Sequence, residues 1–168
     1  MSSSKTKTFL KKIFSLLSVV RGYNILVLII AQYLVSIFIF SPGKSIRNIV
    51  FDFDLLNIVL ASVCVVAAGY IINNFYDVKV DRINRPLKTG IDNYVKQETK
   101  LRLYFFLNFL GFMFGLLVSW KAALFFSVYI FGIWFYSHKL KKHAFTGLIS
   151  ATVLTILPFF AVFVYYKN

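Results

Sequence analysis

Long apolar runs alternate with short polar connections along the whole chain. The runs cover about residues 23–40, 53–72, 101–120, 122–137 and 145–166. A helix needs roughly 20 apolar residues to cross the hydrocarbon core of a bilayer, and each run is close to that length. The pattern therefore predicts an all-α integral membrane helical bundle with about five transmembrane helices.

The polar stretches mark the ends of these helices. Residues 1–12 are rich in Ser, Thr and Lys and are expected to form a flexible or interfacial cytoplasmic lead-in. Residues 13–168 contain no evident linker, so they are expected to form a single membrane domain. Within that domain, residues 82–100 are expected to form a basic loop in which Pro86 and Gly90 break helical structure, with a short interfacial helix from Asn93 as an option. Pro158 is expected to kink the last helix.

Composition agrees with a membrane protein. The chain is 59% hydrophobic and only 15% charged, which is too apolar for a soluble domain of 168 residues. The net charge of +13 could indicate a nucleic-acid partner. However, the basic residues lie between the apolar runs, where membrane topology explains them better, so no nucleic-acid partner is expected.

The basic residues also predict the orientation of the helices. Lys and Arg number five in the N-terminal segment, two in the next connection, then seven, one and three, with one in the tail. Connections rich in Lys and Arg stay on the cytoplasmic side. The N-terminus, residues 73–102 and the turn at 139–142 are therefore expected on the cytoplasmic face of the cell (inner) membrane, where the two richest polar motifs would meet.

The first of these motifs has the spacing of a ligand-binding face. Asn73, Asp77 and Asp81 recur every four residues, so on a helix they share one side. Carboxylate and amide oxygens suit a hard cation such as Mg²⁺, which completes its shell with water and substrate phosphates. Solvated loop carboxylates are the simpler explanation, but ionisable groups at the end of a membrane helix are more often functional.

Other polar residues also have simple explanations. Asp52 and Asp54 begin the second apolar run, where carboxylates stabilise a helix N-terminus. His138 and His143 flank lysines in a turn and are expected to be solvated. Cys64, the only cysteine, is expected to be a small core residue, and it rules out a disulfide within the chain.

These motifs resemble a known family. The pattern N-x-x-x-D-x-x-x-D followed by Arg-Ile-Asn-Arg-Pro-Leu-Lys-Thr-Gly, residues 73–90, is similar to the first signature of the UbiA family of intramembrane prenyltransferases. Tyr136-Ser137 with Leu140-Lys141-Lys142 resembles that family's second conserved patch. Arg21 and Asn24 resemble an Arg…Asn pair near its first helix. The resemblance implies part of a bundle of about nine helices.

The resemblance also implies roles for individual residues. Asp77 and Asp81 would be catalytic and would hold Mg²⁺ with Asn73. Tyr136 and Arg21 would be further site residues. The diphosphate of a prenyl donor would be bound by Asn73, Asn74, Arg85, Lys139 and Lys141.

The implied reaction is Mg²⁺-dependent transfer of a polyprenyl group from its diphosphate to a small acceptor in the membrane. The acceptor would be a quinone precursor or a prenylglycerol phosphate. Aromatic and basic anchoring at a helix end is an equally good explanation of Tyr136 and Lys141.

Two departures from the family pattern stand out. Asn74 replaces an Asp of the usual signature, and no acidic residue follows Glu98, whereas the family has a second paired-Asp motif late in the chain. The chain is therefore expected to be the N-terminal portion of a longer protein and to be incomplete as an enzyme.

The alternatives are not all enzymes. One is a non-enzymatic multi-span membrane scaffold, or a fragment of a transporter, whose acids only bind protein partners. Another is a membrane transferase acting on alcohol phosphates, but the closely spaced acids with a Gly-Ala-Arg core that such enzymes need do not occur here.

Overall fold

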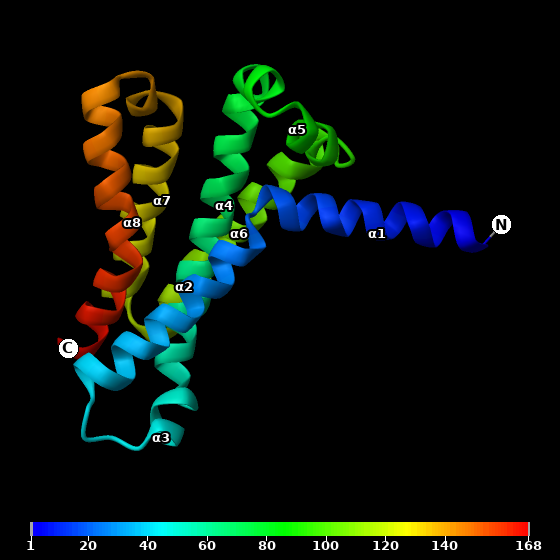
Figure 1. The fold of residues 1–168 in the computed structure, drawn as a ribbon. Helices are drawn as coiled ribbons and strands as arrows, with labels where there is room; N and C mark the ends of the chain where they lie inside the picture. The colour runs from blue at the N-terminus through cyan, green and yellow to red at the C-terminus, as the bar shows by residue number, and fades with distance from the viewer. Residues whose placement is uncertain (1, 168) are drawn as a thin grey trace.

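The computed structural model describes residues 2–167, with side chains from residue 10 onward, and the described chain is helical with short connections. Ten helical segments follow one another (Figure 1). They are α1 (Ser2–Val19), α2 (Gly22–Val35), a π-helical segment η1 (Ser36–Phe40), α3 (Ile46–Val50), α4 (Phe53–Asn84), α5 (Pro86–Asp92), α6 (Gln97–Val118), α7 (Trp120–His138), a 3₁₀ segment η2 (Leu140–Lys142) and α8 (Ala144–Lys167).

Four of these helices are long and apolar enough to cross a membrane, so the chain is an integral membrane protein. They are α2 continued through η1 (Gly22–Phe40), α4, α6 and α8. The fifth expected helix, α7, is present with 19 residues but is not among the four. Its Trp and Tyr rings and Lys121 lower its mean hydropathy.

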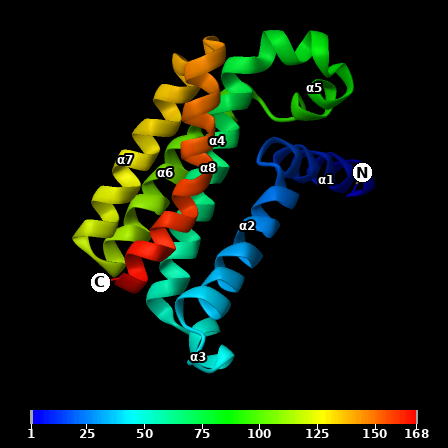
Figure 2. The same ribbon diagram turned by 60° about the vertical axis from the view of Figure 1, so that its left-hand side comes forward.

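The centre of the bundle is α4, which the other long helices surround (Figure 2). Of its most apolar stretch 67% is buried, against 11–22% for the other three candidate spans. Glycines of α6 allow close packing, because a Cβ on Gly111 would lie 2.7 Å from a methyl of Val65. Asp52 caps the start of α4 as expected, accepting hydrogen bonds from the amides of Asp54 and Leu55.

Pro158 interrupts the hydrogen bonding of α8, and side chains of other helices compensate. Proline has no N–H to offer the carbonyl of Leu154. That carbonyl instead accepts a hydrogen bond from the Tyr129 hydroxyl at 3.0 Å, and the Pro158 carbonyl accepts one from Gln32 Nε2 at 2.8 Å. Because no water is available in the bilayer core, these contacts allow the proline to be kept in a membrane helix.

One expectation about local structure was wrong. The expected loop at 82–100 is largely helical, because α4 continues to Asn84 and Pro86 then occupies the first position of α5, where its missing N–H costs nothing. The expected lead-in at 1–12 is helical from Ser2 onward as part of α1, while Met1 lies outside the described residues. A helix fits the interfacial alternative of that expectation, which is taken up below.

Candidate active site

The candidate site begins where α4 leaves the membrane. A helix of 32 residues is about 48 Å long, whereas the hydrocarbon core is about 30 Å thick. The last turns of α4 must therefore project beyond the core. The motif that starts at Asn73 lies on these turns, on the same helix as the buried centre of the bundle.

One side of these projecting turns carries the three expected ligands. Asn73, Asp77 and Asp81 lie four residues apart on continuous helix, and each is partly exposed. The side chain of Asp81 makes no hydrogen bond or ion pair within the part of the chain that the structure describes, so its carboxylate is available to a ligand.

The second motif reaches this face through Lys141. The ammonium of Lys141, in η2 between α7 and α8, forms an ion pair with the Asp77 carboxylate and donates a hydrogen bond to Asn73 Oδ1 at 3.3 Å. The two polar motifs, 64 residues apart in sequence, thus meet as their orientation predicted. A cation already balances the carboxylate at this position.

A cavity of about 570 Å³ opens beside Asn73, between α2, α4, α7 and α8. Most of its polar lining residues are near the projecting turns of α4, and they include Arg21, Asn24, Tyr70, Asn73, Tyr136 and Ser137. Most of the remaining lining is apolar and includes Val27, Leu28, Val66, Ile133, Leu154 and Phe159, with Tyr129 and Thr155 as polar exceptions. A pocket with a polar mouth and an apolar body suits a molecule with a charged head and a hydrocarbon tail.

Arg21 reaches the mouth of this cavity from the link between α1 and α2. Its backbone is left-handed, with φ of 52°, which is costly for a residue with a Cβ. The guanidinium lies 5.1 Å from the centre of the Tyr70 ring, and Asn24 Nδ2 donates to the Tyr70 hydroxyl at 3.2 Å. The expected Arg21–Asn24 pair is therefore assembled around Tyr70.

Two expected phosphate ligands are less well placed. Arg85 lies in the link between α4 and α5 and Lys139 at the end of α7, and both are exposed. Neither side chain makes a hydrogen bond or ion pair within the described residues. Both lie at the Asp77 end of the bundle and are free to reach a ligand there.

Asn74 has a different position from the one expected. It is buried, donating from Nδ2 to the Asp92 carboxylate at 2.9 Å and accepting from Lys100 Nζ at 2.9 Å. Asp92 also accepts from Ser18 at 2.8 Å and from Lys88 at 3.2 Å. The network joins α1, α4, α5 and α6, so both polar atoms of the Asn74 side chain are occupied by protein partners.

Sequence reasoning missed Asp92 and Lys100. Asp92 lies in a stretch expected to be a loop, and Lys100 at the start of an apolar run looked like an ordinary helix-end cation. Their only local signal is the i, i+4 spacing of Lys88 and Asp92. Their hydrogen-bond partners on other helices come from α1 and α4, and no local pattern shows that.

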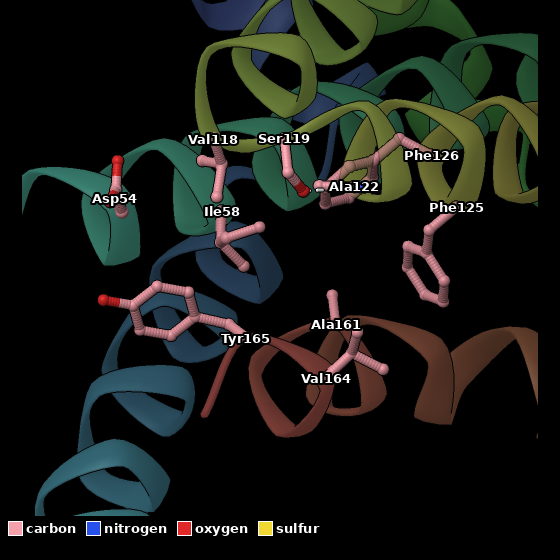
Figure 3. A pocket seen from close by; sticks show the side chains of 10 residues that line it. All are labelled: Asp54, Ile58, Val118, Ser119, Ala122, Phe125, Phe126, Ala161, Val164 and Tyr165. Atoms are coloured by element: carbon pink, nitrogen blue, oxygen red, sulfur yellow. Dashed lines mark hydrogen bonds between the residues drawn. The ribbon is translucent and has the colours of Figure 1, made fainter. Parts of the chain in front are cut away.

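A smaller cavity of about 220 Å³ lies at the opposite end of α4, where Asp54, Ser119 and Tyr165 line it (Figure 3). Most of the side chains drawn there are aliphatic or aromatic. The nearby Asp52 carboxylate accepts a hydrogen bond from the Tyr165 hydroxyl at 2.8 Å. These acids stabilise a helix start and a helix contact, and they lie far from the carboxylates of the candidate site.

The oxygen atoms around Asp77 are of the kind that binds a hard divalent cation, but they are too few to hold one by themselves. Two carboxylates and an amide present oxygens on one helix face, as Mg²⁺ sites that rely on substrate phosphates do. No group of three or more His, Cys, Asp or Glu side chains that could hold a metal by themselves occurs among the described residues. The site therefore suits a cation that arrives with a phosphate ligand.

Comparisons with known proteins found similar sequences and a similar fold. A model of the UbiA prenyltransferase family matches residues 29–168. The digeranylgeranylglyceryl phosphate synthase of Thermococcus gammatolerans is 35% identical over 89 residues, covering 53% of this chain and 32% of that protein. The synthase of the same name from Saccharolobus solfataricus is 29% identical over 110 residues, covering 64% and 39%.

A solved structure has the same fold. It comes from work on digeranylgeranylglyceryl phosphate synthase in membranes and superposes with a TM-score of 0.76 at 21% identity. The match covers 90% of this chain but 52% of that structure. The chain thus corresponds to about a third to a half of the length of the proteins it matches.

Proposed function

Because the chain belongs to the UbiA prenyltransferase family, we propose that the Asp77 end of α4 and the cavity beside it bind a prenyl diphosphate. The proposed reaction is transfer of the polyprenyl group to a small acceptor within the membrane. The observation that carries the proposal is the contact of Lys141 with Asn73 and Asp77, because Asn73 also lines a large, mostly apolar cavity.

Asn73, Asp77 and Asp81 would hold Mg²⁺ together with the diphosphate oxygens. Bound there, Mg²⁺ would offset the negative charge of the diphosphate and so stabilise it as a leaving group. The carboxylates themselves repel a diphosphate. The cation is therefore needed before the donor can approach this face.

Lys141 would change partners when the donor binds. Its ammonium neutralises Asp77 in the free protein, and it lies close enough to the same face to transfer to a phosphate oxygen. Arg85 and Lys139 would add charge-assisted hydrogen bonds from the same end of the bundle. Arg21 would stay against Tyr70 and close the cavity mouth.

The apolar body of the cavity would hold the isoprenoid chain and keep water away from the reacting carbon. Where the cavity meets the Asp77 end, the bond between the allylic carbon and the diphosphate oxygen would break, and the diphosphate would leave with the electron pair. The acceptor oxygen or carbon would then form the new bond, and its proton would pass to the released diphosphate. The rings of Tyr70 and Tyr136 line the cavity, where an aromatic face stabilises a cation by roughly 0.5–2 kcal/mol.

The acceptor class follows from the relatives. Both synthases compared above are named for the product digeranylgeranylglyceryl phosphate. We therefore favour a prenylglycerol phosphate acceptor over a quinone precursor. The excess of Lys and Arg at the Asp77 end supports a cytosolic position for this end.

Binding of a non-reactive prenyl thiodiphosphate to the purified chain, with and without Mg²⁺, tests the proposal. Asp77→Asn and Asp81→Asn should each remove the Mg²⁺-dependent part of the affinity. Asp54→Asn is the matched control, because its carboxylate lies at the opposite end of α4, and it should bind as the native chain does. Unchanged binding by both Asp77→Asn and Asp81→Asn would leave only a membrane scaffold.

A further inference from the structure

The first helix, α1, has an apolar stripe that no other part of the described chain covers. Leu10, Ile13, Phe14 and Leu17 recur at the spacing of one helical face. Between 39% and 62% of each side chain is exposed. The helix is not among those apolar enough to span a membrane, so its exposed stripe is not explained by a transmembrane position.

Contacts with the rest of the protein fix the rotation of α1 about its own axis. Ser15 is fully buried and its hydroxyl donates to the Asp92 carbonyl at 3.3 Å, while Ser18 donates to the Asp92 carboxylate at 2.8 Å. The ammonium of Lys11 lies 5.5 Å from the centre of the Tyr94 ring. The face bearing these residues packs against α5 and the segment after it, so the apolar stripe is directed to another side.

The axis of α1 has the orientation of a helix that lies along the membrane surface. In Figure 1 it leaves the bundle crosswise to α4 and α8, on the side where α5 lies. Membrane-spanning helices stand within a few tens of degrees of the bilayer normal. A helix crosswise to them therefore runs roughly in the membrane plane, over about 27 Å for its 18 residues.

The charge of this segment matches an anionic surface. Lys11 and Lys12 are exposed, two further lysines precede them, and the sequence has no acidic residue before Asp52. Basic residues beside a membrane are attracted to anionic lipid headgroups. An amphipathic helix with lysines and an opposite apolar face is the usual form of a segment that lies in the interface.

We propose that α1 is an interfacial helix that binds anionic lipids on the Asp77 side of the membrane. Leu10, Ile13, Phe14 and Leu17 enter the boundary between headgroups and acyl chains, and Lys11 and Lys12 contact lipid phosphates. The helix also has a structural consequence for the site. Because Ser18 binds Asp92, and Asp92 binds Asn74, a membrane-seated α1 helps to hold the start of the motif on α4.

Site-specific fluorescence on the full chain tests this. In a Cys64→Ala background, an NBD label at Phe14→Cys reports on the stripe, and the same label at Gly43→Cys, in the exposed turn between η1 and α3, is the control. The chain is reconstituted in nanodiscs of phosphatidylcholine with or without 30% phosphatidylglycerol, an amount chosen for the test. We expect blue-shifted emission and quenching by doxyl-labelled acyl chains at position 14, and water-like emission at position 43.

The lipid dependence gives the second readout. Quenching at position 14 should increase with phosphatidylglycerol, and the double substitution Lys11→Gln, Lys12→Gln in the Phe14→Cys chain should reduce that increase at least twofold. Equal, water-like emission at both positions would overturn the proposal. A blue shift at position 14 without doxyl quenching would also overturn it, because the stripe would then be buried against a second copy of the chain.

Discussion

At the scale of single residues, Lys141 and Asp92 have similar electrostatic roles in different surroundings. Each neutralises a group of opposite charge and joins segments far apart in the sequence. Lys141 does so where both partners are partly exposed, so a ligand can replace Asp77. Asp92 does so inside the protein, at 2% exposure, so its partners are permanent. The partly exposed Lys141 can therefore take part in ligand binding, whereas the buried Asp92 supports the structure around the site.

Lys141→Met should weaken binding of the prenyl thiodiphosphate. A charge-assisted hydrogen bond of this kind contributes about 1.5–3 kcal/mol, so the dissociation constant should rise roughly 10- to 100-fold. Titration of the analogue in saturating Mg²⁺ measures this. Lys142→Met removes an exposed neighbour of the same charge and should change the constant less than threefold. Equal losses in both variants would mean that only overall charge matters.

Asp92→Asn should destabilise the protein strongly. Removing one partner of a buried ion pair costs about 3–5 kcal/mol, and here Lys88 and Lys100 would lose the nearest compensating charge. The thermal unfolding midpoint in detergent is the measurement. Glu98→Gln is the control, because its ion pair with Arg102 is exposed and contributes little. A midpoint as high as that of Glu98→Gln would contradict this role for Asp92.

At the scale of elements, the apolar runs predicted the long helices well, but not where α4 ends. Pro86 and Gly90 suggested a loop, yet Pro86 fits the first turn of α5 and Gly90 lies within that short helix. Because α4 continues past Asn73 as a helix, Asn73, Asp77 and Asp81 lie on one side of it. On the same extension, the side chain of Asn74 is bound by Asp92 and Lys100, which a match to a signature does not reveal.

Close packing of α4 against α6 gives a prediction for this scale. Gly111→Ala would bring a methyl group to 2.7 Å from Val65, and overpacking of this kind costs about 1–3 kcal/mol. Gly90→Ala is the matched control, since no atom lies within 4 Å of its added Cβ and alanine favours a helix. The unfolding midpoint should fall for Gly111→Ala and stay level or rise for Gly90→Ala. The opposite order would show that this helix pair is loosely packed.

At the scale of the whole molecule, the sequence predicted the class, the family and the meeting of two motifs on one face. These follow from hydropathy, charge alternation and a signature, all of which are local. The Asp92 network, the seating of α1 and the cavity shape come from contacts among several helices. The sequence carries no periodic signal for such contacts.

The extent of the match leads to a prediction about activity. The chain corresponds to 32% and 39% of the two synthases compared with it, and no acidic residue follows Glu98. We therefore expect these 168 residues alone to bind the donor but to transfer its prenyl group poorly. Incubation of the purified chain with a radiolabelled donor and a prenylglycerol phosphate measures transfer. Efficient turnover would mean that one carboxylate face is sufficient.

Under the proposed function, a cation and a diphosphate occupy the face formed by Asn73, Asp77 and Asp81. A crystal structure of the chain with Mn²⁺ and a prenyl thiodiphosphate tests this most directly, because Mn²⁺ is located by its anomalous scattering. We expect an anomalous peak at coordination distance from Asp77 or Asp81 and from a phosphate oxygen, with Lys141 moved onto the diphosphate. A bound analogue whose diphosphate lies elsewhere, with no metal at this face, would contradict it.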